Sequence, residues 1–571
     1  MRKVLSYLKP YTPRMLIGLM IKIFGTLMDL VIPYILSFMI DDLVPLGDIK
    51  PIILYGIIMI GCSGACFLGN MSANQMASKV AKMVTTDLRH DLFKKIEDLS
   101  PKQMDDITIP SLISRMNNDT YNVHHFVGMI QRLGVRAPIL LIGGIIVTFT
   151  LDVKLTLVLL AVLPFIVLIT VAISKKGIPL YTDIQNASDD MVRDIRESVT
   201  GIRVIKALSK TEYEKKRFSE VNQNVIKNEL KAGYTMARLS PLINLCLNVG
   251  LVSVLVVGAY LVIGDEIKVG KIIAFISYFH IILNAMLSVT RIFTMSSRTI
   301  ASAKRIEAVF DLDEDLKTTY SKDEDASSHI EFRDVCFSYN GKVDNLTNIN
   351  FKLKKGESLG IIGPTGSGKT TIISLLLRLY DVNSGKVLID GQNVKSLEED
   401  ILRSKFGIAF QNDILFSASI RDNIRFNRDI DDEKIIKAIE IAQAKDTVFS
   451  KKEGLDYMIS AKGTNISGGQ KQRLLIARAI ANKPDILILD DSSSALDYKT
   501  DASLRKALKE FNKDTTTIII SERISSIINC EHILLRIQYI SDNVLLHQKP
   551  QIDMRVQCEH HQILLFRMRT F

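Results

Sequence analysis

The sequence predicts an all-α transmembrane domain of six helices followed by an α/β domain, and three observations support this prediction. The chain has 571 residues, of which 47% are hydrophobic and 23% are charged, so it is apolar and long enough for more than one domain. Almost all long apolar runs lie before residue 295. Beyond it, the apolar stretch Leu359 to Ile362, a loop and the helical pattern Thr371 to Leu379 form a strand, loop and helix.

The first domain, residues 1–310, contains six segments that reach or approach the roughly 20 apolar residues needed to cross a bilayer. They are Met15 to Ile40, Ile52 to Met71, Val127 to Thr150, Leu155 to Ile173, Pro241 to Ile263 and Ile272 to Phe293. The first run is too long for a removable signal peptide and lacks a small-residue cleavage site. The long connections are helical in pattern, so we expect the helices to continue beyond the bilayer.

Basic residues predict the orientation of these spans. The connections Ser72 to Phe126 and Ser174 to Ser240 are rich in Lys and Arg, whereas the other connections are short and sparsely basic. By the positive-inside rule, the N-terminus, both long connections and the second domain are cytoplasmic. The net charge of +10 therefore flanks apolar spans instead of forming one patch. This predicts a lipid bilayer and no nucleic acid as a partner.

A phosphate-binding loop opens the second domain. Residues 363–370 read Gly-Pro-Thr-Gly-Ser-Gly-Lys-Thr, a full match to GxxxxGK[ST]. Glycines let backbone N–H groups close around phosphates, Lys369 reaches the outer phosphates, and the Thr370 hydroxyl can ligate Mg²⁺. Downstream, a buried-strand pattern ends at Asp490, as in sites that hold the same ion. These motifs predict an α/β P-loop NTPase domain that binds ATP and Mg²⁺. The predicted ATP-binding residues here are Gly363, Pro364, Thr365, Gly366, Ser367, Gly368, Lys369, Thr370 and Thr371.

A further motif gives the chain a family resemblance. Ile466-Ser467-Gly468-Gly469-Gln470, just ahead of Asp490, resembles the signature of ATP-binding cassette (ABC) proteins. Six spans ahead of one cassette resemble a half-transporter of the type I ABC exporters, over about residues 1–534. The resemblance implies an ATP hydrolase coupled to transport, with a linker at 311–328 and an ABC cassette at 329–534. It also implies a second half-transporter as partner, because the signature of one chain closes on the ATP of the other.

The resemblance assigns further residues. Tyr339 matches the aromatic residue that stacks on adenine, and Gln411 matches the glutamine that touches Mg²⁺ and the attacking water. The implied Mg²⁺ ligands are therefore Thr370, Gln411 and Asp490. The loop that crosses between two cassettes, the D-loop, is Ser494, Ala495, Leu496 and Asp497.

Two catalytic positions depart from the family pattern. Asp491 stands where active members place the Glu that polarises water, and Glu522 replaces a histidine that contacts the γ-phosphate. Aspartate is one methylene shorter, and a misplacement of about 1 Å can lower the rate by roughly 100-fold. An ionised Glu522 repels phosphate unless desolvation keeps it protonated. The loop before the signature, Ile459 to Gly463, also lacks the usual Glu.

These departures resemble the degenerate subunit of heterodimeric bacterial exporters, which implies export of amphipathic small molecules across the bacterial cytoplasmic membrane. One alternative is a homodimeric exporter of lipid, peptide or drug in which Asp491 acts as a slow base. An alternative of another class is a regulator or sensor that binds ATP without transport. A third is the inactive product of a damaged gene, which rests on the chain's last segment.

Polar residues on the last two spans give a hint about substrate. Residues at helical spacing on one face of the last span are Ser277, His280, Asn284, Ser288 and Arg291, and Asn244 and Asn248 are spaced in this way on the preceding span. The first interpretation of such residues is hydrogen bonding between helices. The alternative is a substrate cavity lined by Ser277, His280 and Asn284, together with Lys22, Asp29 and Arg136.

Three other segments carry predictions. Thr108 to Ser114 and Lys210 to Phe218, near the tips of the cytoplasmic hairpins, are candidates to dock on a cytoplasmic domain. Residues 535–571 match nothing that the family resemblance implies. A change of reading frame near codon 535 is one interpretation, and a divergent native tail is the other.

Overall fold

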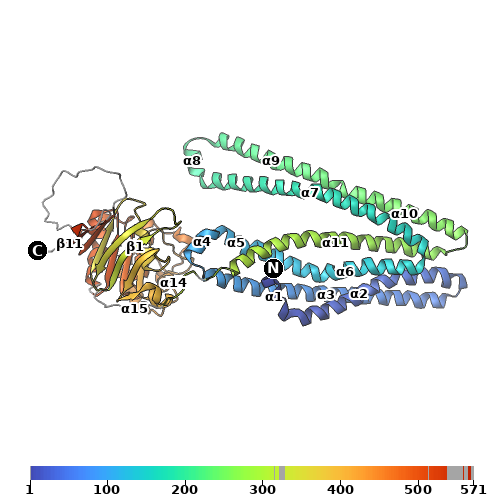
Figure 1. Ribbon diagram of the computed structural model, residues 1–571, viewed down its shortest axis with the longest axis horizontal. Coiled ribbons are helices and arrows are strands. Elements are labelled where there is room, and N and C mark those ends of the chain that lie inside the picture. Colours follow the sequence, from blue (N-terminus) through green and yellow to red (C-terminus); the bar gives the residue numbers. More distant parts are fainter. Residues whose placement is uncertain are drawn as a thin grey trace. The chain divides into compact units, whose positions relative to one another are not determined.

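The structure is a computed structural model that describes residues 2–313, 315–319, 328–511, 514–536, 557–558 and 563–567. The chain divides into two compact units. The first comprises Met1–Glu97 and Pro110–Leu312, and the second comprises Asp98–Ile109 and Asp313–Phe571. The first unit is helical, and the described strands all belong to the second (Figure 1).

The membrane unit contains six helical segments that are long and apolar enough to cross a bilayer, counted over the described residues. Each contains one predicted span, so the prediction of six spans is confirmed. Each segment is also 42 to 53 residues long, well beyond the roughly 20 that a crossing needs. The segments are Lys3–Leu46, Ile49–Glu97, Ile109–Leu151, Val153–Thr200, Thr211–Ile263 and Val269–Phe310.

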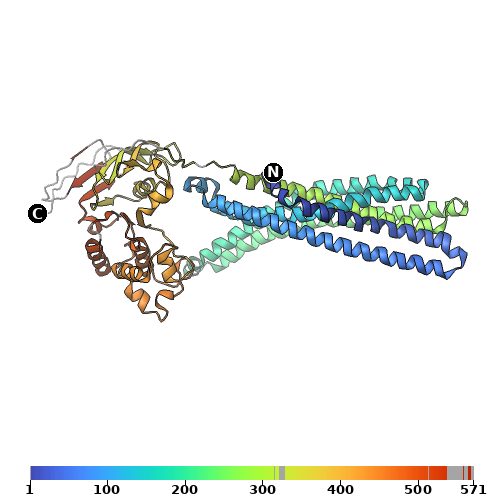
Figure 2. The same cartoon turned by 90° about the horizontal axis from the view of Figure 1, so that it is seen from below.

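These helices pack as two groups that share one core. Helix α3 packs on α2 and α6, α11 packs on α6, and α7 packs on α9 and α10 (Figures 1 and 2). At the α6–α11 contact, a Cβ at Gly144 would lie 2.8 Å from Ile282 Cγ1, so a small residue is needed there. The helices are α1 (Arg2–Ser6), α2 (Thr12–Phe38), α3 (Ile49–Glu97), α5 (Ile109–Ser114), α6 (Thr120–Leu151), α7 (Val153–Thr200), α8 (Ile202–Ala207), α9 (Thr211–Ala237), α10 (Leu239–Ile263) and α11 (Val269–Phe310).

The second unit is built on two sheets. In the described residues, an antiparallel sheet has the order β2-β1-β4-β5, and a largely parallel sheet has the order β10-β11-β9-β3-β8-β7-β6. Strand β7 is buried along its whole length, as expected for a parallel strand covered on both faces. The strands are β1 (Ile330–Phe337), β2 (Leu346–Leu353), β3 (Ser358–Ile362), β4 (Ser384–Ile389), β5 (Gln392–Asn393), β6 (Phe406–Ala409), β7 (Ile486–Asp490), β8 (Thr516–Ile520), β9 (His532–Arg536), β10 (Gln557–Cys558) and β11 (Ile563–Arg567).

Two hydrophobic cores hold this unit together. One joins the two sheets and α12, and the other lies among α14 to α18 and the face of the parallel sheet. The predicted α/β fold is confirmed. The helices are α4 (Pro101–Ile107), α12 (Lys369–Leu376), α13 (Glu399–Ser404), α14 (Ile420–Arg425), α15 (Asp432–Ile441), α16 (Lys445–Phe449), α17 (Gly468–Ile480), α18 (Tyr498–Phe511) and α19 (Ile524–Ile527).

Predictions were also made for two segments of the cytoplasmic hairpins, for the linker and for the tail. Residues 98–109 belong to the second unit, so the contact with the cassette lies mostly before the predicted stretch Thr108 to Ser114. Lys210 to Phe218 remains with the membrane unit, where Arg217 pairs with acidic residues of α7. Half of the linker 311–328 and most of the tail 535–571 lie outside the described residues. Within the tail, β11 pairs antiparallel with β9.

Candidate functional site

The predicted nucleotide site lies where four neighbouring parallel strands end. The phosphate loop follows β3, Glu522 follows β8, Asp490 ends β7 and Gln411 follows β6. These strands are adjacent in the order β3-β8-β7-β6. Because ligands of open α/β sheets bind beyond the carboxyl ends of the strands, the topology gathers these side chains at one edge.

The loop itself has the geometry of a phosphate cradle. Gly366 and Gly368 adopt positive φ values of 84° and 86°, which side chains rarely tolerate. Gly368 caps the N-terminus of α12, whose dipole favours an anion. The Lys369 ammonium donates to the carbonyls of Gly363 (2.7 Å) and Pro364 (3.0 Å), which holds it over the loop. The loop can therefore surround a phosphate chain with donors.

A hydroxyl and a carboxylate form a suitable magnesium pair beside the loop. Thr370 Oγ1 donates to Asp490 Oδ2 at 3.1 Å. Burial, and the charge of the adjacent Asp491, raise the pKa of Asp490. Mg²⁺ is usually held by one or two carboxylates together with substrate phosphates, so this pair fits an ion bound with nucleotide. No cluster of three or more His, Cys, Asp or Glu suited to a metal occurs in the described chain.

Two further carboxylates occupy the predicted catalytic positions. Gln411 Nε2 lies 3.5 Å from Asp491 Oδ2, and Thr365 Oγ1 donates to Glu522 Oε1 at 3.0 Å. Burial, then the charge of Glu522, raises the pKa of Asp491. Glu522 itself is exposed. The site therefore places negative charge next to the loop that has to hold phosphate.

The predicted adenine-stacking residue belongs to an aromatic cluster. Tyr339 packs edge-on against Tyr380, with ring centroids 5.1 Å apart, and also against Phe337. The Tyr380 hydroxyl donates to Asp105 Oδ2 of α4 at 3.0 Å. Ser100 caps α4 through a capping box with Gln103. The aromatic cluster thus joins the edge of the nucleotide pocket to α4.

The pocket brings most of the predicted residues together. A cavity of about 290 Å³ is lined by Tyr339, Thr365, Gly366, Gly368, Lys369, Thr370, Thr371, Gln411, Asp490, Asp491 and Glu522. Gly363, Pro364 and Ser367 complete the loop outside this lining. Asn345 and Ile520 also line it and were not predicted; Asn345 accepts from the Tyr339 backbone N–H at 3.1 Å. Neither residue belongs to a motif, so the sequence carried no signal for them.

The signature lies outside this pocket. Ser467 caps α17 through a capping box with Gln470. Ile466 is half-buried and Gly468 is exposed, and a Cβ at Gly468 would meet only Ala495 Cβ at 3.8 Å. Gly469 packs more closely, since its Cβ would lie 3.1 Å from Ala495 O. The signature therefore contacts the D-loop of its own chain and presents an exposed helix start.

The D-loop is fixed by polar contacts on both sides. Gln472 of α17 donates to Ser494 Oγ (3.0 Å) and accepts from the Ala495 backbone N–H (2.9 Å). Arg523 donates to the carbonyl of Ser494 at 2.9 Å. Leu496 is buried, and Asp497 caps the following turn through Thr500.

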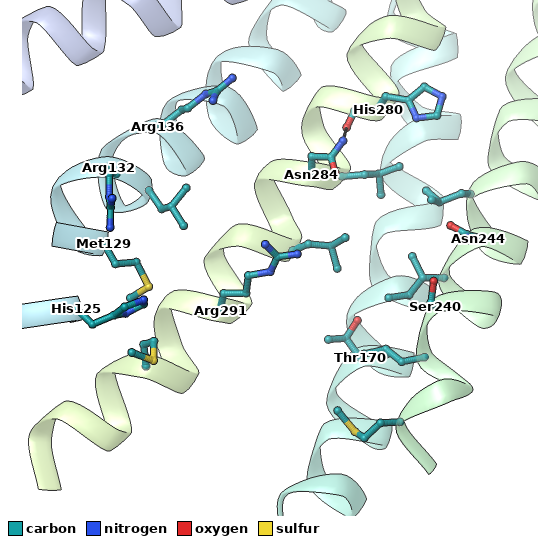
Figure 3. A pocket seen from close by; sticks show the side chains of 18 of the residues that line it. His125, Met129, Arg132, Arg136, Thr170, Ser240, Asn244, His280, Asn284 and Arg291 are labelled. Atoms are coloured by element: carbon teal, nitrogen blue, oxygen red, sulfur yellow. Dashed lines mark hydrogen bonds between the residues drawn. The ribbon is translucent and has the colours of Figure 1, made fainter. Parts of the chain in front are cut away.

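A second cavity, of about 1140 Å³, lies among the membrane helices (Figure 3). His280, Asn284, Lys22 and Arg136 line it, whereas Ser277 does not; its hydroxyl donates to the carbonyl of Ile273. Lining residues that the sequence reading missed include His125, Met129 and Arg132, which with Arg136 recur at helical spacing along α6. That helical spacing is the sequence signal that could have identified these lining residues.

Comparisons with known proteins identify the family. The transmembrane region of ABC transporters matches residues 15–286, and the ABC transporter cassette matches residues 346–494. The uncharacterized ABC transporter ATP-binding protein YfiB of Bacillus subtilis is 32% identical, over 94% of this chain and 93% of its own. The chain therefore belongs to the ABC transporter family, with a membrane region and a cassette in one polypeptide. It is a multi-pass membrane protein whose cassette binds ATP.

Two other similarities are informative. A relative in Staphylococcus aureus, named as a candidate multidrug export ATP-binding/permease protein, is 30% identical over 94% of each chain. A bacterial Atm1-family ABC exporter, solved with ATP bound, is 21% identical and superposes with a TM-score of 0.77, covering 92% of this chain and 93% of that one. The fold is thus that of an ABC exporter, a class that works as dimers in the membrane.

Proposed function

We propose that this chain is one half of a heterodimeric ATP-driven exporter in a bacterial cytoplasmic membrane, and that its own ATP site is impaired in hydrolysis. The supporting observation is the pairing of Asp491 and Glu522 in one pocket, each a departure from the family pattern. The transported compounds are amphipathic small molecules, in keeping with the large cavity among the membrane helices.

In this proposal, the residues of the nucleotide pocket retain ATP and the residues of the signature serve the partner. The phosphate loop, with Lys369, binds ATP. Thr370 and Asp490 would hold Mg²⁺, which would neutralise phosphate charge. Asp491 is too short to align water well, and Glu522 adds repulsion instead of a donor. This site therefore retains ATP, while Ser467 and Gly468 of the signature complete the partner's site. Hydrolysis there reopens the dimer.

Two substitutions in this chain separate the heterodimer from the homodimer. In a degenerate half, Asp491→Asn leaves most of the ATPase activity of the purified transporter, because hydrolysis occurs at the other site. Gly468→Asp abolishes it, because the signature can no longer approach the partner's phosphate. The structure leaves room for this side chain, so the variant should fold. Equal loss of activity from both substitutions would establish the homodimer and overturn the proposal.

Two measurements test the remaining alternatives. A second half-transporter should copurify with this chain from native membranes. Inside-out vesicles, with their cassettes and the added ATP on the outside, should accumulate an amphipathic dye only when both halves are present. A protein that binds ATP but shows neither ATPase activity nor dye movement would be the regulator or sensor.

A further inference from the structure

The cavity of the membrane unit carries positive charge that export of amphipaths in general does not explain. Lys22 lines it. So do Arg132, Arg136 and Arg291, and His125 and His280 add two imidazoles (Figure 3). None of the described lining residues is acidic. Asp29, outside the lining, pairs with Arg136 at 2.7 Å, which leaves a clear excess of cations.

Membrane topology alone does not account for these cations. Basic residues that orient a span work at its water-exposed flanks. Lys22 is only 3% exposed, and its ammonium donates to Asn74 Oδ1 of α3 at 3.0 Å. The Arg136 Nε and His125 Nδ1 atoms are buried without a hydrogen-bond partner in the described chain. Buried ionisable groups in membrane helices are costly, and they usually mark a ligand path.

The cations share the cavity with apolar side chains. Lys22, Arg132 and Arg291 lie within about seven residues of the predicted cytoplasmic ends of their spans, on the order of 10 Å at about 1.5 Å per residue, and Arg136 and His280 lie deeper. Leu247 and Leu283 line the same cavity. A ligand that matches both kinds of side chain has a charged head and an apolar chain.

We propose that this cavity takes an anionic amphipath, an apolar chain that ends in a phosphate, sulfate or carboxylate. This substrate class rests on the proposed export function. At about 1140 Å³ the cavity exceeds the usual range of about 300–1,000 Å³ for small-molecule pockets, so it has room for the chain as well as the head. A cationic amphipath of the same length is repelled by the same side chains.

Competition binding tests the charge preference directly. The full chain, with any subunit that copurifies, is placed in phosphatidylcholine nanodiscs with the fluorescent anion dansyl-undecanoate. Dodecyl phosphate should displace the probe at a concentration at least tenfold lower than dodecyltrimethylammonium does. Arg132→Gln and Arg291→Gln should each weaken displacement about three- to tenfold, and Arg132→Lys should restore it. Arg193→Gln, an exposed arginine outside the cavity, is the matched control.

Each outcome of these experiments bears on the anionic substrate class or on the exporter function. Equal or better competition by the cation, or unchanged affinity in both Gln variants, overturns the proposal. Discs that contain phosphatidylglycerol distinguish two sources of the anion: loss of probe binding assigns a lipid head group, and unchanged binding assigns a free amphipath. ATP-driven transport of cations alone refutes the anionic class but keeps the exporter. Anion binding without ATP-dependent transport refutes the exporter but keeps the site.

Discussion

Removing the charge of Glu522 should strengthen ATP binding to this chain. The Glu522 carboxylate accepts a hydrogen bond from Thr365 of the phosphate loop, at 3.0 Å, so its charge lies next to the cradle. Two unit charges about 4 Å apart interact by about 4 kcal/mol at an effective dielectric constant of about 20. Glu522 is exposed, and solvent and Mg²⁺ screen it, so we reduce this to roughly 1 kcal/mol. Glu522→Gln should therefore bind ATP about five- to tenfold more tightly.

Fluorescent ATP titrated against the full chain in nanodiscs measures this effect. Glu510→Gln makes the same change at an exposed position of α18 outside the pocket and should leave the affinity unchanged. An affinity that is equal or weaker in Glu522→Gln would refute the electrostatic account.

The pH dependence gives a second readout of the same reasoning. Burial, then the charge of Glu522, raises the pKa of Asp491. An ionised Asp491 opposes phosphate, so ATP affinity should rise as pH falls through this pKa. In Glu522→Gln one cause of the raised pKa is gone, and the rise should move to lower pH. A shift to higher pH would contradict the assigned cause.

Three other substitutions probe separate parts of the cassette. Tyr339→Ala should weaken ATP about tenfold through lost stacking, since such stacking is worth about 1–3 kcal/mol per base, while inorganic triphosphate binds as before. Asp490→Asn should remove the strengthening of ATP binding by Mg²⁺, with affinity in EDTA unchanged. Tyr380→Phe deletes the 3.0 Å bond to Asp105, so amides of α4 should exchange about fivefold faster at constant ATP affinity. Burial raises the pKa of Tyr380, so the phenol remains a donor at working pH.

The sequence predicted the chemistry of the nucleotide site because short motifs encode it. Strand, glycine loop and helix are contiguous, and Asp490 directly ends a strand. The motifs do not show which residues outside them line or support the pocket. Asn345 reaches the pocket through the backbone of Tyr339, a contact between neighbouring segments that no spacing rule describes.

In the membrane unit, the sequence predicted the helices and their polar faces, but not which residues of a face line the cavity. Helical periodicity places Ser277, His280 and Asn284 on one face of α11, yet only the last two line the cavity. Periodicity identifies the face of a helix, whereas the extent of a cavity depends on packing against other helices. Similarly, the helix that belongs to the cassette unit, α4, starts at the capping box of Ser100 and Gln103 and so lies before the predicted stretch Thr108 to Ser114.

The contacts around the D-loop bear on the proposed combination of an impaired site with an intact signature. Arg523 and Gln472 hold the loop through the carbonyl and hydroxyl of Ser494, and that hydroxyl also donates to the carbonyl of Asp491 at 3.0 Å. Each of these contacts uses an atom of Ser494, so we expect the departures at Asp491 and Glu522 to leave α17 in place. Because α17 carries the residues offered to the partner's ATP, the chain can lose hydrolysis at its own site and still supply what a second site requires. This separation favours the heterodimer, where only one site has to turn over.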